Sequence, residues 1–411
     1  VSGADDDGDS FLDFDCGGDD CDDESDAVHP GAEESCDGDD DDCDGITDAT
    51  ALAGPLELAT GAAIVEPSAA FGGGVAFVVW QTGADDASAV HAAALDSDGN
   101  TIGTAVDFTA EGGDGAVGRA PSVVRGDSAF WVAWVADGPS TAPRVTVMEF
   151  AVDTAADEIT AGTALSVGSD SATAIARPSI AWDGAGSGWV VGYAASYENS
   201  EVVELAAEEM HGETDASFAV SAAAGAIDGL SLAVLGADDY VLAYSRADET
   251  TDGDLEVFAT EIELVAELFC HGAGFPLRIS FADATDVEPS FSPSVASNGA
   301  GTWVAAFSDT SSLDMTSATD IVAYSGGDLI PLLEEGSRSY GDPSLVFDGA
   351  AYGLLSLARL GTFESLGFLS LDAALAAPSS PYAGTPLADS TGSDDTSSGR
   401  LVATGAGRFA A

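Results

Sequence analysis

The chain has 411 residues, 45% of them hydrophobic, and is long enough to bury a sizeable core. It carries 72 acidic residues against ten basic ones, all of them arginine, and its formal net charge is −62 at pH 7. This charge excludes nucleic acid and anionic membranes as partners, because both would be repelled. No stretch of 18 apolar residues predicts insertion into a bilayer. Cations remain as partners, either bound metal ions or the ions of a salt-rich medium.

The first 48 residues form a distinct segment. They contain 21 acidic residues, no lysine or arginine, and few large apolar side chains, so they cannot fold around a core of their own. Four cysteines, Cys16, Cys21, Cys36 and Cys43, crowd into this segment, whereas Cys270 stands alone and is expected to be a small buried side chain. Four cysteines allow three pairings; we favour Cys16–Cys21 and Cys36–Cys43, because each closes a short loop. Clustered cysteines favour an oxidising compartment, and we predict a secreted or surface protein that begins at a processed N-terminus.

Three stretches of this segment have the alternating carboxylates of a calcium loop. In the clearest one, Gly45 permits a sharp turn and Ala51 replaces the bidentate glutamate of an EF-hand. The competing interpretation is a solvated acidic spacer. The predicted calcium ligands are Asp40, Asp42, Asp44, Ile46 (through its carbonyl) and Asp48 in this loop, Asp5, Asp7, Asp9, Phe11 (through its carbonyl) and Asp13 in the second, and Asp22, Glu24, Asp26 and Glu33 in the third.

The segment CDDESDAVHPGAEESCDGDDDDCDGITD resembles an Asp/Cys-rich metal-binding motif of secreted and surface proteins from myxobacteria and related bacteria. Ser25 and Asp41 depart from the usual pattern. The resemblance implies a secreted metal-binding module and covers only about the first 48 residues. One branch of that family binds copper, but the lone His29 and the hard oxygen ligands favour calcium here. The matching positions are Cys21, Asp22, Asp23, Pro30, Gly31, Ala32, Cys36, Asp37, Gly38, Asp42, Cys43, Asp44, Gly45 and Asp48.

Residues 49–411 are predicted to form a second domain that is all-β. Short runs of Val, Ala, Phe and Trp alternate with Gly, Asp and Ser, which is typical of short strands and turns. A unit that begins with Pro-Ser, turns at glycine and continues into an aromatic-rich strand recurs every 50 to 63 residues, and it predicts one four-stranded propeller blade. The seven starts lie at residues 67, 121, 178, 230, 293, 343 and 399.

Six of these units are complete and the seventh stops half-way. We favour seven blades, with PLELATGAAIVE (residues 55–66) as the outer strand of the last one, because closure removes free sheet edges; six blades is the alternative. Large side chains of the second strands are expected to pack between blades rather than stack on sugars. They are Trp80, Trp134, Tyr193, Tyr244 and Phe307.

The sequence contains no recognisable catalytic constellation, and we predict that the protein is not an enzyme. The stretches WDGAGSGW and SNGAGTW resemble the Asp-box turns of sialidase-like propellers, which are structural. The favoured function is a calcium-binding structural or adhesive protein that self-associates into an extracellular assembly such as a filament. The alternative is a carbohydrate-binding module or a sialidase-like glycoside hydrolase. Paired carboxylates in a central pocket would favour the hydrolase, whereas an axis blocked by Ala and Val would favour the structural protein.

Overall fold

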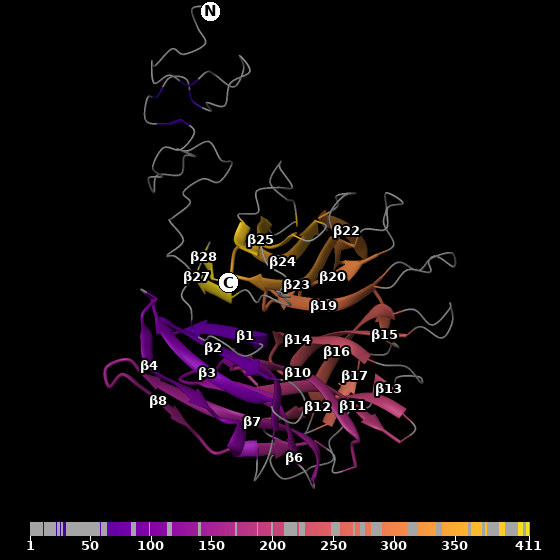
Figure 1. Ribbon diagram of the computed structural model, residues 1–411. Helices are drawn as coiled ribbons and strands as arrows, with labels where there is room; N and C mark the ends of the chain where they lie inside the picture. Colours follow the sequence, from indigo (N-terminus) through magenta and orange to yellow (C-terminus); the bar gives the residue numbers. More distant parts are fainter. Residues whose placement is uncertain are drawn as a thin grey trace, which may run out of the picture. The chain divides into compact units, whose positions relative to one another are not determined.

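Antiparallel β-strands make up almost all of the regular structure in the computed structural model (Figure 1). The structure describes most of residues 64–371 with short gaps, the strands at 386–390, 402–405 and 408–410, and a few single positions, among them Phe11, Asp22 and His29. The chain divides into two compact units, Val1–Thr60 with Pro378–Ala383 and Gly61–Ala377 with Gly384–Ala411. No helix in the described part of the chain has the length and apolar character needed to cross a membrane.

The second unit contains six antiparallel sheets of four or five strands, which we call blades 1 to 6. Blade 1 contains β1 (Ile64–Gly72), β2 (Val75–Thr82), β3 (Ala89–Asp96) and β4 (Thr101–Asp107), and the 3-10 helix η3 (Thr109–Gly112) follows it. Blade 2 contains β5 (Val117–Arg125), β6 (Phe130–Gly138), β7 (Thr141–Asp153), β8 (Glu158–Ala161) and β9 (Leu165–Val167). Blade 3 contains β10 (Ala174–Asp183), β11 (Gly188–Tyr197), β12 (Ser200–Ala207) and β13 (Val220–Ser221).

The other three blades follow the same order. Blade 4 contains β14 (Ile227–Gly236), β15 (Asp239–Ala247), β16 (Leu255–Val265), β17 (Leu268–His271) and β18 (Leu277–Arg278). Blade 5 contains β19 (Ser290–Ser297), β20 (Trp303–Asp309), β21 (Asp320–Ser325) and β22 (Asp328–Leu333). Blade 6 contains β23 (Ser339–Phe347), β24 (Tyr352–Leu360), β25 (Phe363–Leu371) and β26 (Pro386–Ser390).

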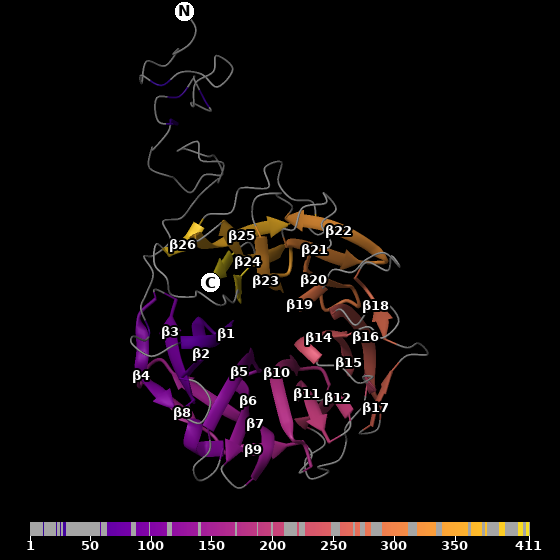
Figure 2. The ribbon, with the colours of Figure 1, turned by 45° about the vertical axis from the view of Figure 1, so that its right-hand side comes forward.

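The blades follow one another around a central axis in chain order (Figure 2). The first strand of each blade is the innermost, and five contacts join these six strands in chain order, from β1–β5 to β19–β23. The fold is therefore an all-β propeller with six complete blades, which confirms the predicted fold class and the lower of its two blade counts.

The seventh repeat start does not make a full blade. It forms only the two-stranded sheet of β27 (Val402–Gly405) and β28 (Arg408–Ala410). Strand β27 contacts both β1 and β23, so this hairpin lies between blades 1 and 6. The preference for seven blades was wrong because the described part of this unit is a single hairpin.

The hydrophobic core lies between the blades. Five clusters of buried apolar side chains join successive blades, from the pair 1–2 to the pair 5–6. Trp134, Tyr193, Tyr244 and Phe307 are buried in four of them, as their spacing predicts. Trp80 is also buried and stacks on His91 of the neighbouring strand, with ring centroids 5.7 Å apart. Burial of one large side chain from each second strand thus holds neighbouring sheets together.

The hairpin turns after the first strands are held by their own side chains. The Asp348 carboxylate accepts hydrogen bonds from the amides of Ala350 and Ala351, both 2.7 Å long. Asn298 does the same for Ala300 and Thr302. The Asn298 turn, which lies within SNGAGTW, has the structural role that its resemblance to an Asp-box implies.

We expect Trp134→Ala to lower the free energy of unfolding by about 3–5 kcal/mol, the usual cost of truncating a fully buried aromatic side chain. Its side chain is fully buried between blades 1 and 2. Leu277→Ala is the matched control, because Leu277 is 51% exposed and its truncation should cost under about 1 kcal/mol. Denaturant titration of both variants measures the difference, and equal losses would contradict the interblade core.

Alkaline pH should weaken the propeller through its buried tyrosines. Burial, and then the nearby Glu204 carboxylate, raises the pKa of Tyr193 far above its ordinary value. The unfolded chain loses this proton above about pH 10 while the folded chain keeps it, so the free energy of unfolding falls with pH, by about 1.4 kcal/mol per unit for each such group. Tyr193→Phe should reduce that slope, which denaturant titrations between pH 9 and 11 would measure; an unchanged slope would contradict it.

Candidate functional site

Each innermost strand bulges just before its repeated serine. The register of β1 against β2 shifts between Val65 and Ser68, and equivalent shifts occur in the other five blades. The bulge contains one residue followed by proline, except in blade 4, where it contains Gly229 alone. We call the residue at this position in each blade the bulge ring. Its members are Glu66, Ala120, Arg177, Gly229, Ser292 and Asp342.

The bulge ring has an unusual backbone conformation. All six members have positive φ angles, among them 52° at Glu66, 26° at Arg177 and 48° at Asp342. This conformation costs a residue with a Cβ about 1–2 kcal/mol, and a following proline restricts the backbone further. Gly229 avoids that cost, and it also lies against blade 5, where an added Cβ would come within 3.0 Å of Pro293 Cδ. Five of the six blades therefore hold a strained residue beside the axis.

Serines next to the bulges link the blades to one another. Ser68 Oγ accepts a hydrogen bond of 3.1 Å from the amide of Val123 in blade 2, and the pattern repeats around the ring. The other links run from Ile180 to Ser122, from Leu232 to Ser179, from Val295 to Ser231 and from Leu345 to Ser294, with lengths of 2.9 to 3.3 Å. Each repeated serine thus fixes the distance between two inner strands.

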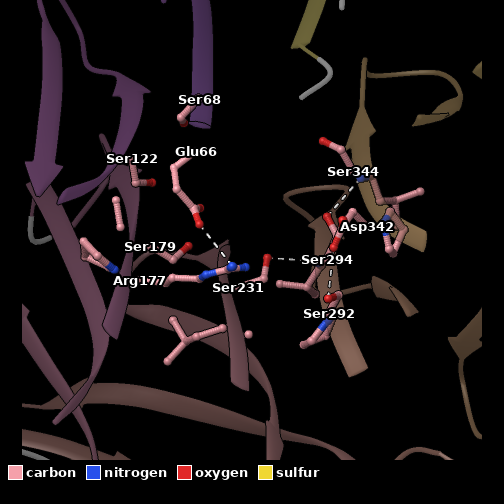
Figure 3. Close-up of a pocket in the computed structure, with 18 of the residues that line it drawn as sticks. Glu66, Ser68, Ser122, Arg177, Ser179, Ser231, Ser292, Ser294, Asp342 and Ser344 are labelled. Atoms are coloured by element: carbon pink, nitrogen blue, oxygen red, sulfur yellow. Dashed lines mark hydrogen bonds and ion pairs between the residues drawn. The ribbon is translucent and has the colours of Figure 1, made fainter. Parts of the chain in front are cut away.

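A pocket of about 260 Å³ lies on the axis, lined by the bulge ring and the serines (Figure 3). Ligand pockets usually measure about 300–1,000 Å³, so this one suits a small ligand. Its charged lining residues are Glu66, Arg177 and Asp342, and Glu66 Oε1 lies 3.0 Å from Arg177 Nη2. Ser292 Oγ donates a hydrogen bond of 3.2 Å to Asp342 Oδ1. Among the described lining residues, carboxylates outnumber cations by one.

The ion pair in the pocket spans two repeats, from blade 1 to blade 3. The side chain of Arg177 is 48% exposed and that of Glu66 26%, so water reaches both and their attraction is screened. Figure 3 shows both side chains directed into the pocket, with Asp342 and Ser292 on another part of its wall. A ligand can therefore displace the pair at low cost and reach both carboxylates.

Other arginines contact partners of their own. Arg119 pairs with Asp137, Arg278 pairs with Glu256, and the guanidinium of Arg125 lies 4.7 Å from the Phe130 ring centroid. Arg177 is the single arginine among the described pocket-lining residues. The arginine cluster that an acidic sugar would require is therefore not formed by this lining.

Most of the predicted metal ligands lie outside the described residues. This applies to Asp5, Asp7, Asp9, Asp13, Glu24, Asp26, Glu33, Asp40, Asp42, Asp44, Ile46 and Asp48, and to the four clustered cysteines. Of the two that are described, Phe11 stacks on His29 with ring centroids 4.8 Å apart, and the Asp22 carbonyl accepts the Ser25 amide at 3.0 Å. Within the described residues, no group of three or more His, Cys, Asp or Glu is placed to hold a metal ion.

The pocket residues were missed at the sequence level because the repeat was aligned on Pro-Ser. The informative position is the residue before the proline, which differs in every blade while Pro-Ser recurs. Arg177 and Glu66 both occupy this position, and they pair with each other.

Comparison with known proteins gives one motif and one fold. Residues 20–49 match a family model for copper binding of the MopE type, described as "Putative metal-binding motif". No curated protein matches the chain. The N-terminal segment therefore contains the metal-binding motif that the sequence indicates, and the described residues after it form the propeller.

Several solved structures are similar to the chain. A Penicillium chrysogenum α-L-arabinanase is 11% identical, with a TM-score of 0.46. The match covers 75% of this chain and 93% of the arabinanase. A Trypanosoma rangeli sialidase is 12% identical with a TM-score of 0.45 and covers 75% of this chain, which spans 54% of the sialidase. A GH43 endo-arabinanase from Bacillus licheniformis is 9% identical, with a TM-score of 0.34. The match covers 63% of this chain and 92% of the endo-arabinanase.

These neighbours correct two predictions. They are glycoside hydrolases, and they contradict the predictions that the chain is a structural or adhesive protein and is not an enzyme. They agree with the alternative, a carbohydrate-binding or glycoside hydrolase propeller. The axis supplies the physical reason, because it is not blocked by Ala and Val but opens into a pocket that contains two carboxylates.

Proposed function

We propose that the propeller binds a neutral carbohydrate in its axial pocket and hydrolyses a glycosidic bond there. The observation that carries this proposal is the presence of Glu66 and Asp342, from blades 1 and 6, in the wall of one pocket. Glycoside hydrolysis needs two carboxyl groups, one to protonate the leaving oxygen and one to act as nucleophile or to activate water. The two bulges hold these side chains on a rigid ring of strands, as such a reaction requires.

The rest of the lining suits a ligand rich in hydroxyl groups. Serine oxygens accept amide hydrogen bonds from the next blade, and a hydroxyl that accepts one bond still carries a proton to donate. Aromatic rings are absent from the described lining, so affinity comes from hydrogen bonds rather than from stacking.

The charge of the pocket favours a neutral sugar over an acidic one. The single guanidinium, that of Arg177, is already paired with Glu66, and Asp342 carries the excess carboxylate. A sugar acid would meet this carboxylate as well as the field of a chain with a net charge of −62.

Glu66→Gln and Asp342→Asn should each lower kcat by about 100-fold or more while a neutral oligosaccharide still binds, because proton transfer by a positioned carboxyl contributes that much. The assay measures reducing ends released from a panel of neutral oligosaccharides, with calorimetry for binding. Glu261→Gln is the matched control, a carboxylate that accepts the Trp303 indole N–H and does not line the pocket.

Two outcomes would contradict the proposal in different ways. Binding without release of reducing ends by the parent chain would remove hydrolysis and leave recognition. A panel in which no sugar binds would remove both.

For the N-terminal segment, we propose calcium as the metal and secretion as the setting. The match to a metal-binding motif at residues 20–49 supports a metal, and alternating carboxylates favour a hard cation. Secretion agrees with the clustered cysteines and with the resemblance to secreted proteins. Self-association stays a prediction.

Calorimetric titration of the chelator-stripped chain should reveal at least two calcium sites, and deletion of residues 1–48 should abolish them. Copper(II) is the competing metal, because the matching family model is named for it. Tighter binding of copper than of calcium at the same segment would overturn the assignment, and heat that persists after the deletion would place the sites elsewhere.

A further inference from the structure

The residue type at the bulge-ring position changes from blade to blade, whereas the neighbouring positions repeat. The six blades repeat one unit, and five of them repeat proline and serine in the same places. At the ring position itself the six blades present six different residue types: an acid, a small apolar residue, a base, a glycine, a hydroxyl and a second, shorter acid. Equivalent positions in equivalent sheets face equal demands from the fold. The fold therefore fixes the proline and the serine, and it leaves the ring position open in every blade except blade 4, where Gly229 lies against Pro293.

The backbone makes this variety unfavourable for stability. Glycine adopts a positive φ angle without a steric penalty, and blade 4 shows that the bulge forms with glycine. The other five blades nevertheless hold side chains in the left-handed region, where a Cβ is disfavoured. Of the eight non-glycine residues with positive φ in the described part of the chain, five belong to this ring, and strain gathered around a pocket is typical of sites where function opposes stability.

The ring is also uneven around the axis. The acids stand in blades 6 and 1, and the base stands in blade 3 between Ala120 and Gly229, which project little or nothing into the pocket. The long side chain of Arg177 thus has no bulky ring neighbour on either side and reaches across to Glu66, 3.0 Å away. The polar groups and the open space of the pocket therefore both follow from the residues at this one position.

We propose that the bulge ring is the specificity-determining element of the pocket: its side chains are kept against backbone strain because they contact the ligand, and the ring as a whole selects a neutral sugar that fits beside Ala120 and Gly229. The identity of the ligand rests on the proposed function, whereas the backbone strain of the ring does not.

The first test compares glycine with alanine at the same position. Both substitutions remove the side chain, so their difference reports the backbone alone. At Glu66, Ser292 and Asp342 the glycine variant should melt about 1–3 °C above the alanine variant, because glycine relieves the strain. At Thr160, an exposed residue of β8 that pairs in regular register with Ala151, the order should reverse, because glycine in an ordinary strand is destabilising.

The second test separates ligand contact from support. Glu66→Gly and Asp342→Gly should weaken binding of the best neutral oligosaccharide by at least about tenfold while melting as high as the parent chain or higher. Ser280→Ala removes a buried hydroxyl outside the pocket that accepts the Val257 amide, and it should do the opposite, lowering the melting temperature with less than about a threefold change in affinity. The double exchange Glu66→Arg with Arg177→Glu retains an ion pair and should still lose affinity, which a purely structural pair would not.

The outcomes are distinguishable. If the alanine variants melt above the glycine variants at the ring positions, as expected at Thr160, the inference is overturned whether or not a sugar binds. Glycine melting above alanine with affinity unchanged shows that the ring does not contact the ligand, and it overturns the inference as well. A panel with no binding sugar overturns the proposed function, and the glycine–alanine order then still decides the claim of strain.

Discussion

The hydrogen bond from an inner-strand amide to the serine hydroxyl of the preceding blade is the contact on which the rest of the propeller depends. It recurs five times between blades 1 and 6 at nearly constant length. It sets the distance between inner strands, and with it the width of the pocket they surround. Clusters of apolar side chains further from the axis then fill the wedge between each pair of sheets. A side-chain acceptor is suited to this role because successive inner strands belong to separate sheets and exchange no ladder hydrogen bonds.

The bulge allows the same strand to serve both the fold and the site. In a regular strand, successive side chains point to opposite faces of the sheet. The direction of the serine would then also fix the directions of the residues before it. The extra residue breaks that alternation and bends the strand. In five blades the proline that follows has no amide hydrogen and so leaves no unpaired donor at the irregularity. The result is a ring of side chains whose directions are independent of the ladder.

The sequence predicted the propeller because its strongest signals are local. The Pro-Ser starts, the glycine turns and aromatic residues such as Trp134 and Tyr244 all lie within one blade, and they repeat. The blade count was harder, because ring closure depends on contacts between segments distant in the chain, β1, β23 and β27. The pocket was harder still. Glu66 and Arg177 are 111 positions apart in the sequence. They meet because β1 and β10 both bulge and because the ring of blades curves, and the sequence of one blade does not predict that curvature. The two pocket carboxylates, Glu66 and Asp342, were missed because a search for clustered motifs overlooks residues supplied by different repeats.

The junction between blades 6 and 1 is built differently from the other five junctions of the ring. Blades 1 to 6 are joined in sequence by five buried clusters, whereas among the described residues no such cluster joins blade 6 back to blade 1. That junction instead contains β27 and β28, strands of four and three residues. Strand β27 contacts both β1 and β23 across this junction. Glu66 and Asp342 stand on its two sides. The spacing of the two carboxylates therefore depends on a hairpin that is remote from both of them in the sequence.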